Sequence, residues 1–303
     1  MSKNRQMCQF ADIGDEKKDG VNQPAGFRPP WLVQRLPAGG EYKRVSELMN
    51  RLDLNTVCSS ASCPNLGECF GCGTATFLIL GGICTRNCAF CAVPKGAPPP
   101  VDPAEPDRLA QAVAALNLKH AVITSVTRDD LPDGGAAHFA ACVLRVGQLC
   151  PGTTVEVLIP DFAGDHAALC AVLAARPAVL NHNTETVPRL YPRVRPGADY
   201  RRSLELLARA AAGGTCTVKS GLMVGLGEHP AELRGVFADL IDAGVSALTI
   251  GQYLRPSPAH LPVVEYVTPE QLGRYREQAY DAGFKKVAAG PLVRSSYRAA
   301  AML

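Results

Sequence analysis

Short apolar runs that alternate with helical stretches constrain the fold of this 303-residue chain more than any other feature of its sequence. Six runs have the composition of buried strands, and segments with helical periodicity follow them. Strict alternation of this kind predicts parallel strands, in an open α/β sheet or a partly closed barrel. The strands are expected at residues 74–80, 120–126, 153–159, 178–182, 216–224 and 246–253, and the helices near 105–118, 135–149, 165–175, 201–212, 230–243 and 269–282.

Two common nucleotide-binding motifs are absent from this pattern. No G-x-G-x-x-G turn follows the first predicted strand, and Gly221, Gly225 and Gly227 have a different spacing. A phosphate loop of the form G-x-x-x-x-G-K-S/T is also missing. The sequence therefore argues against a nicotinamide-dependent enzyme and against a nucleoside triphosphatase.

Composition indicates a globular protein with a large core, since 47% of the residues are hydrophobic and 19% are charged. The apolar runs are far shorter than the roughly 20 residues of a membrane-crossing helix, and charged residues interrupt the first 20 positions, unlike an export signal. A net charge of +3 does not indicate a nucleic-acid partner. Twelve cysteines in such a chain favour a compartment that keeps thiols reduced. We therefore expect a cytoplasmic protein that binds neither membrane nor nucleic acid.

A first cysteine triad follows the first predicted strand directly. Cys84, Cys88 and Cys91 have the spacing C-x3-C-x2-C. Thiolates so close on one loop can wrap a compact metal centre, and soft sulfur ligands select iron–sulfur clusters, zinc or copper. A structural zinc takes four ligands, whereas a [4Fe–4S] cluster held by three cysteines leaves one iron open to a substrate or cofactor. The count of three therefore favours a cluster.

A second triad precedes the first strand. Cys58, Cys63 and Cys69 are spaced C-x4-C-x5-C, which predicts a different site from the first triad. Cys72 is the nearest candidate for a fourth ligand. Because Cys69 and Cys72 form a C-x-x-C pair, half of a zinc ribbon or a redox pair is an alternative interpretation of this segment.

The first triad, placed after the first strand of a βα series, resembles that of the radical S-adenosylmethionine (SAM) enzymes. The second triad and several islands of sequence narrow the resemblance to the lipoyl synthase family, over residues ~50 to 298. The islands are residues 122–130, 181–183, 194–200, 220–228, 251–254 and 294–297, the last of which reads RSSY.

This resemblance implies an α/β fold, a partial (β/α)6 TIM-like barrel with an N-terminal cluster-binding extension and a short C-terminal tail. It divides the chain into an extension with the auxiliary cluster cysteines (1–72), a radical SAM partial barrel (73–285) and a tail with the RSSY motif (286–303). Functional groups of such barrels gather at the carboxyl ends of the strands. We therefore expect the strand ends to face one cavity.

The implied cofactors are two [4Fe–4S] clusters and SAM. By resemblance, the cluster on the first triad binds SAM, and the cluster on the second triad is the auxiliary one. A serine of the RSSY tail completes the auxiliary site in the family, a role that the resemblance gives to Ser296, with Ser295 as its neighbour. The family pattern has no cysteine at Cys72, which lies close enough in sequence to compete with Ser296 for iron.

Four further residues are expected to contact SAM. Phe90 resembles an aromatic residue that the family places against the adenine, although a core position is its alternative. The polar residues Asn181, Asn183 and Glu185 follow the fourth predicted strand, where they could hydrogen-bond the ribose or methionyl group; capping of the next helix by Asn183 or Thr184 is the alternative.

The reaction implied is that of a sulfurtransferase. It inserts two sulfur atoms at the sixth and eighth carbons of an octanoyl group attached to a lysine of a lipoyl carrier protein or domain. Hydrogen is removed by 5′-deoxyadenosyl radicals from SAM, the auxiliary cluster supplies the sulfur, and an electron donor such as ferredoxin or flavodoxin is required. A local group of arginines could attract an acidic carrier. The group comprises Arg189, Arg193, Arg195, Arg201 and Arg202.

Two alternative functions remain open at this point. One is another two-cluster radical SAM sulfur-inserting enzyme that acts on a different substrate. The other is a non-catalytic iron–sulfur or zinc protein used for metal delivery or electron transfer. The second triad joined to the RSSY tail favours the lipoyl interpretation over both.

Overall fold

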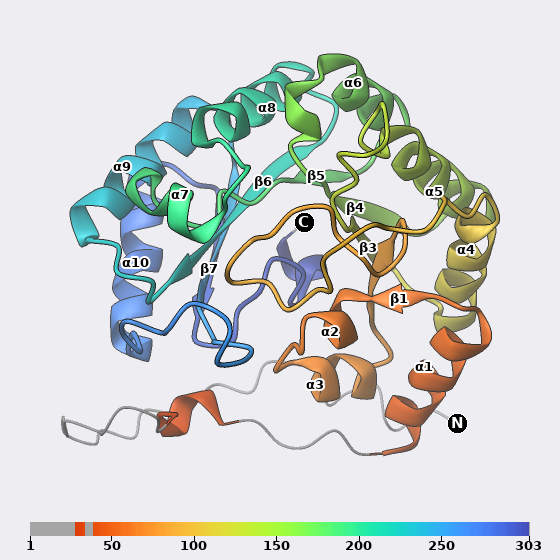
Figure 1. Cartoon of the computed structure of the whole chain (residues 1–303), viewed down its shortest axis with the longest axis horizontal. Helices are drawn as coiled ribbons and strands as arrows, with labels where there is room; N and C mark the ends of the chain where they lie inside the picture. The colour runs from red at the N-terminus through yellow and green to blue at the C-terminus, as the bar shows by residue number, and fades with distance from the viewer. Residues whose placement is uncertain (1–27, 34–38, 303) are drawn as a thin grey trace.

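The computed structural model describes residues 28–33 and 39–302, and its centre is an eight-stranded sheet curved into an incomplete ring (Figure 1). The strands stand in sequence order; β1 is antiparallel to β2, and each later pair is parallel. Their bounds are β1 (Asn55–Thr56), β2 (Thr76–Ile79), β3 (His120–Ser125), β4 (Thr154–Leu158), β5 (Val179–Asn181), β6 (Thr217–Val224), β7 (Ala247–Gln252) and β8 (Lys286–Gly290).

Helices cover the outside of this ring (Figure 1). All six predicted strand–helix units are present, from β2 with α4 to β7 with α10, which confirms the expected fold class. The helices of these units are α4 (Glu105–Leu116), α5 (Ala136–Leu149), α6 (His166–Ala174), α8 (Tyr200–Ala212), α9 (Pro230–Asp242) and α10 (Pro269–Ala282); the short α7 (Tyr191–Val194) precedes α8.

Local sequence explains where several helices begin and end. The Asp199 side chain accepts a hydrogen bond from the N–H of Arg202 at the start of α8, and Thr268 accepts one from Gln271 at the start of α10. Helix α10 stops at Gly283, whose φ of 114° lies in the left-handed region that favours glycine.

The core lies between the ring and the helices. Strands β2 and β7 are buried along their whole length, as expected for parallel strands covered on both faces. Helix α4 buries Leu109, Val113 and Leu116, which share one face. Burial of each such side chain stabilises the fold by about 1.5–3 kcal/mol. No helix in the described ranges is both long and apolar enough to cross a bilayer.

Both ends of the described chain join the barrel. Before β2 come α1 (Gly40–Arg51), α2 (Val57–Ser60) and α3 (Leu66–Gly71), and β1 pairs with β2. At the other end β8 pairs with β7, and the short 3-10 helix η5 (Ala299–Met302) packs against β3 and β8. The last described residues, in η5, therefore lie within the ring (Figure 1).

The sheet thus reaches into both segments that the sequence assigned to the extension (1–72) and the tail (286–303). β8 was not predicted because its sequence, KVAAG, has one buried apolar residue, Val287, among a lysine and small residues that are half-buried, and hence a weak apolar pattern. β1 was not predicted because it has only two residues. The tail proper begins after Gly290.

Candidate active site

A cavity of about 430 Å³ lies at the carboxyl ends of the strands. Ser125 at the end of β3, Asn183 just beyond β5 and Gly251 near the end of β7 all line it. Ten of the eleven predicted site residues line it as well. They are Cys58, Cys63, Cys69, Cys84, Cys88, Phe90, Cys91, Asn183, Glu185 and Ser296.

The first triad lies on a loop that folds back on itself after β2. The N–H of Cys84 donates to the carbonyl of Pro94 at 2.8 Å, and the N–H of Cys91 donates to the carbonyl of Cys88 at 3.2 Å. Burial, together with the nearby thiols of Cys84 and Cys88, raises the pKa of Cys91 to about 11. Partly buried thiols that share one loop become stable thiolates when a cationic metal centre binds them.

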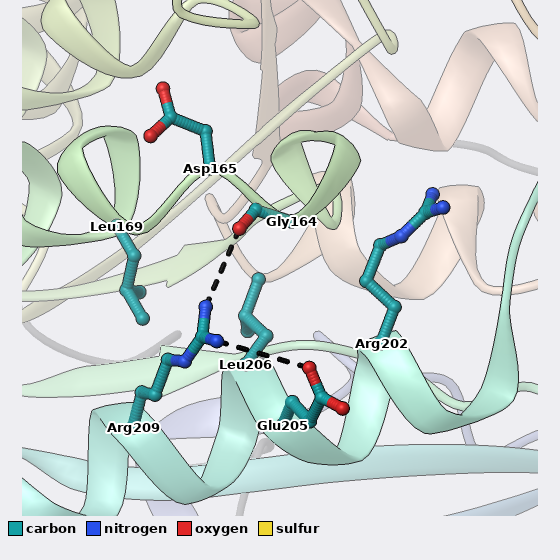
Figure 2. A pocket seen from close by; sticks show the side chains of 7 residues that line it. All are labelled: Gly164, Asp165, Leu169, Arg202, Glu205, Leu206 and Arg209. Carbon is teal, nitrogen blue, oxygen red and sulfur yellow. Dashed lines mark hydrogen bonds and ion pairs between the residues drawn. The ribbon is translucent and has the colours of Figure 1, made fainter.

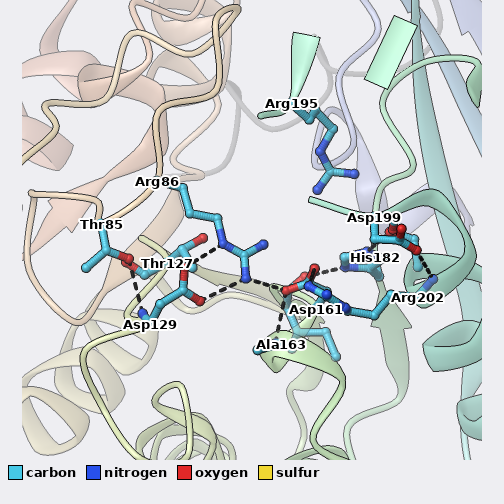
Figure 3. A network of polar contacts seen from close by, with 12 residues as sticks. Thr85, Arg86, Thr127, Asp129, Asp161, Ala163, His182, Arg195, Asp199 and Arg202 are labelled. Atoms are coloured by element: carbon cyan, nitrogen blue, oxygen red, sulfur yellow. Dashed lines mark hydrogen bonds and ion pairs between the residues drawn. The ribbon is translucent and has the colours of Figure 1, made fainter. Parts of the chain in front are cut away.

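A network of charges holds this loop against the barrel (Figure 3). The Arg86 guanidinium, in the middle of the loop, donates to Asp129 at 2.7 and 2.8 Å and to the buried Asp161 at 2.6 Å. Arg202 on α8 approaches the other Asp161 oxygen at 3.3 Å. Although burial opposes ionisation, the hydrogen bond and charge of Arg86 lower the pKa of Asp161 to about 2. Asp161 is therefore a permanent anion that fixes the loop.

The second triad is formed by two short helices and the turn between them. Cys58 belongs to α2 and Cys69 to α3, and the N–H of Cys63 donates to the carbonyl of Cys58 at 3.0 Å. Burial and the thiols of Cys58 and Cys63 raise the pKa of Cys69 to about 12, and all three residues line the same cavity. All six triad cysteines are free thiols.

The C-terminal tail enters the cavity beside the second triad. The Asn65 amide donates to the Leu292 carbonyl at 2.7 Å, and the Tyr297 hydroxyl donates to Glu68 at 2.9 Å. Gly251 makes room for the tail, because a Cβ at this position would lie 2.0 Å from the Val293 carbonyl oxygen. Hydrogen bonds thus join the tail to the segment of the second triad, although the bonded residues are more than 220 positions apart in sequence.

Ser296 stands between these anchors. Its half-buried side chain lines the cavity, and it has no hydrogen bond to any residue that the structure describes. The Ser295 hydroxyl, in contrast, accepts a hydrogen bond from the Asn183 amide at 2.6 Å. Cys72 is the exposed residue at the end of α3, and it does not line the cavity. Of these three side chains, Ser296 is the one that lines the cavity without a hydrogen bond to the described part of the chain.

Polar groups after β5 are divided between the cavity and the barrel interior. The Asn183 amide nitrogen donates to Glu185 at 3.0 Å, while its amide oxygen is buried and has no partner in the described protein. A buried, unpaired acceptor at a cavity wall indicates a ligand that donates to it. Asn181 lies on β5 and donates instead to Glu156 at 3.2 Å, and it is outside the cavity lining. The expectation of a cofactor contact from Asn181 is therefore not supported by its position.

His182 is the histidine between these asparagines. Its ring nitrogens lie 2.8 Å from the Ile159 carbonyl and 3.0 Å from the Ser203 hydroxyl. Burial, chiefly, and the charge of Arg195 lower its pKa to about 4. The ring is therefore neutral and occupied on both sides, as a structural residue.

Arginines in the cavity wall were only partly foreseen. Arg195 belongs to the group of arginines expected to attract a carrier, but it is partly buried, lines the cavity and donates to the carbonyls of Asn183 at 2.9 Å and Thr184 at 3.3 Å. Its Nε has no partner among the described groups. Arg195 lies within the island 194–200, which resembles the family, but nothing in the sequence indicated that its side chain turns toward the cavity. Four arginines and one glutamate line the cavity, namely Arg28, Arg195, Arg255, Arg294 and Glu185.

A second, very small hollow has no such features. It lies between α6, α8 and the preceding loop, and it has space of about 10 Å³ (Figure 2). Arg209 crosses it to the Gly164 carbonyl at 3.4 Å and approaches Glu205 at 3.8 Å. This hollow is a small packing gap between α6 and α8 and is too small to bind a ligand.

The large cavity has the donor set of an iron–sulfur site. Two sets of three thiols and the Ser296 hydroxyl face it, and its excess of arginines offsets the negative charge that thiolates bring. In the described ranges no three His, Cys, Asp or Glu side chains are arranged around a single-ion position. An iron–sulfur cluster takes its thiolates at separate iron atoms. The residues present therefore fit clusters.

Comparison with known proteins agrees with this geometry. A sequence profile of the radical SAM superfamily matches residues 78–240, more than half of the chain. Among solved structures, Streptococcus suis SuiB bound to precursor peptide SuiA superposes with a TM-score of 0.57 at 11% identity, covering 70% of this chain and 48% of that one. The chain is therefore a radical SAM protein, and this class implies a [4Fe–4S] cluster and SAM.

Curated relatives specify the branch of the superfamily. Lipoyl synthase of Nitratidesulfovibrio vulgaris is 57% identical over 89% of this chain and 91% of its own length, and that of Caldanaerobacter subterraneus is 56% identical over 90% and 95%. The chain belongs to the lipoyl synthase family.

Proposed function

We propose that this protein inserts two sulfur atoms at the sixth and eighth carbons of an octanoyl group carried on a lysine of a lipoyl carrier domain. Cys84, Cys88 and Cys91 would hold the cluster that binds SAM. Cys58, Cys63, Cys69 and Ser296 would hold an auxiliary cluster. The observation that supports this division most strongly is that both triads and the RSSY tail line one cavity.

Each of the two proposed cofactor sites would supply a different part of the reaction. When bound, SAM and its cluster would supply hydrogen-atom abstraction from unactivated C–H bonds, and the auxiliary cluster would supply sulfur. General acid–base groups have no acidic proton to remove from such a chain. The protein's own residues therefore bind, orient and exclude water.

Side chains of the cavity suit these tasks. The unpaired Asn183 oxygen can accept a hydrogen bond from a SAM hydroxyl or ammonium group, and the Arg195 charge can attract the SAM carboxylate. Phe90 offers an aromatic surface in the wall, and Leu78 and Tyr253 line the same cavity. Apolar walls of this kind suit an alkyl chain and limit quenching of reactive species by water.

Mass spectrometry tests the proposed reaction directly. An octanoylated carrier peptide, incubated anaerobically with SAM, a reductant and the reconstituted protein, is expected to gain two sulfur atoms. At least two molecules of 5′-deoxyadenosine should form for each product, because two carbons react. A peptide that gains no sulfur while SAM is cleaved would point to a different substrate, and colourless protein that binds zinc would contradict the proposal.

The carrier is proposed to dock near two exposed arginines. Arg189 is paired with Glu232 at 2.7 Å, whereas Arg193 and Arg201 are exposed and have no hydrogen-bond or ion-pair partner among the described residues. Arg193 and Arg201 are therefore available to attract an acidic carrier.

Charge reversal at Arg193 and Arg201 together should weaken carrier binding by about tenfold at low salt, with a smaller loss at high salt because the charges are screened. Titration of an octanoylated carrier by calorimetry measures this change. The matched control reverses Arg234 on α9 and Arg276 on α10, which are also exposed. Equal affinity for the two double variants would exclude the proposed docking site.

We also propose a cytoplasmic location and a low-potential electron donor such as ferredoxin or flavodoxin. Because the six triad cysteines must be reduced to bind the proposed clusters, a reducing compartment suits this function. Without an external electron the proposed cleavage of SAM does not begin.

A further inference from the structure

A buried ion pair lies inside the barrel, away from the cavity lining. The Lys219 ammonium on β6 is 2.8 Å from the Glu156 carboxylate on β4, and the two side chains are 1% and 0% exposed. Full burial of two charges is costly unless each makes further hydrogen bonds. The partners of this pair therefore indicate what it holds in place.

Glu156 is held from three sides. Its Oε1 accepts from Lys219 and from the Asn181 amide at 3.2 Å, and its Oε2 lies 3.3 Å from His120 Nε2. Three strands, β3, β5 and β6, thus orient one carboxylate. This arrangement leaves the Lys219 side chain little freedom to rotate.

Lys219 makes its second contact with the C-terminal tail. Its ammonium donates to the backbone carbonyl of Ser295 at 2.6 Å. The peptide group of this carbonyl also contains the nitrogen of Ser296. A charged, rigidly held donor on the barrel wall therefore hydrogen-bonds the peptide group directly before Ser296.

The other anchors of the tail differ from this one. Asn65 and Glu68 belong to the cysteine-bearing extension, so they tie the tail to a segment that itself lies on the barrel. Asn183, which binds the Ser295 side chain, also faces the cavity. Lys219 is the charged contact between the strands of the barrel and the tail backbone.

We propose that Lys219, oriented by Glu156, is a positioning residue that places Ser296 at the second cysteine triad. This inference rests on the proposed role of Ser296 as an auxiliary-cluster ligand. Lys219 touches neither cluster nor substrate; it acts through the Ser295 carbonyl. Loss of this contact lets the tail move and removes the hydroxyl from the auxiliary site while the first triad stays intact.

The test uses the full-length, anaerobically reconstituted protein with Lys219→Met combined with Glu156→Gln, so that no unpaired charge stays buried. The matched control is Lys119→Met, at an exposed lysine before β3. Hydrogen exchange of residues 292–298 is expected to accelerate by about tenfold or more in the double variant and to remain unchanged in the control. Thermal unfolding verifies that each variant is folded.

A spectroscopic measurement separates this inference from the proposed function. In a Cys84→Ala, Cys88→Ala, Cys91→Ala background, Mössbauer spectra report on the second triad alone. The double variant should reproduce the altered iron site of Ser296→Ala. Faster tail exchange with no spectral change in Ser296→Ala would refute Ser296 as a ligand but retain Lys219 as the tail anchor.

A milder variant keeps the inference testable if the double variant does not fold. Lys219→Arg keeps a positive charge beside Glu156, so that no buried charge is left unpaired, but its guanidinium displaces the donor from the Ser295 carbonyl; exchange of the tail should therefore rise in the same direction by a smaller factor. Parental exchange rates and parental spectra in every folded variant would overturn the positioning role.

Discussion

Replacement of Cys88 by alanine is expected to abolish reductive cleavage of SAM, a loss of about 1,000-fold or more, equivalent to about 4 kcal/mol. Cys88 is one of three thiols that share a loop and a cavity wall with Cys84 and Cys91. Two thiols do not retain a four-iron cluster with one open iron at this position. Chromatographic measurement of 5′-deoxyadenosine, with a strong chemical reductant, checks the result without any dependence on the carrier.

Cys216→Ala is the matched control for this substitution. Cys216 is a partly buried thiol just before β6, outside the lining of the cavity. It should cleave SAM at the parental rate and bind the parental amount of iron. Cleavage by Cys88→Ala at a rate near that of Cys216→Ala would mean that SAM is not activated at the first triad.

The fold was largely predictable because its signals are local and repeated. The helical spacing of Leu109, Val113 and Leu116 corresponds to a real buried face of α4. Parallel strands covered on both sides form continuous apolar runs, which sequence patterns reveal well. The two-residue β1 and the weakly apolar β8 have no such signal, because their pairing partners rather than their own residues make them strands.

The site residues were predictable where they are identified by their spacing in the sequence. They were less predictable where their role depends on how deep in the barrel the side chain lies. The cysteines of each triad are close in sequence and lie close in space. Asn181 and Asn183 are only two residues apart, yet Asn183 faces the cavity and Asn181 contacts Glu156 in the layer below. Strand periodicity does not reveal at which level of a barrel a side chain lies. The contact of Lys219 with Ser295, 76 residues away, likewise requires the folded barrel.

Cys63→Ala, in contrast to Cys88→Ala, should leave SAM cleavage within about threefold of the parental rate but lower sulfur insertion by about 1,000-fold or more. Burial raises the pKa of both Cys63 and Cys88, but the arginine whose charge opposes this shift is Arg294 at Cys63 and chiefly Arg195 at Cys88. The two sets of thiols are therefore separate donor sets in one cavity. Mass spectrometry of the carrier peptide and measurement of 5′-deoxyadenosine in the same reaction check both halves of this prediction.

Cys72→Ala is the control for this substitution. Cys72 forms a C-x-x-C pair with Cys69 of the second triad. Cys72 is exposed and lies outside the cavity lining, so this variant should form the same product as the parent. Ser296→Ala should lower sulfur insertion while Cys72→Ala does not, because the Ser296 side chain is the one that lines the cavity. Product from Cys63→Ala in parental amounts would show that the sulfur comes from elsewhere, since two thiols and a hydroxyl are too few ligands to hold a cluster that is dismantled during the reaction.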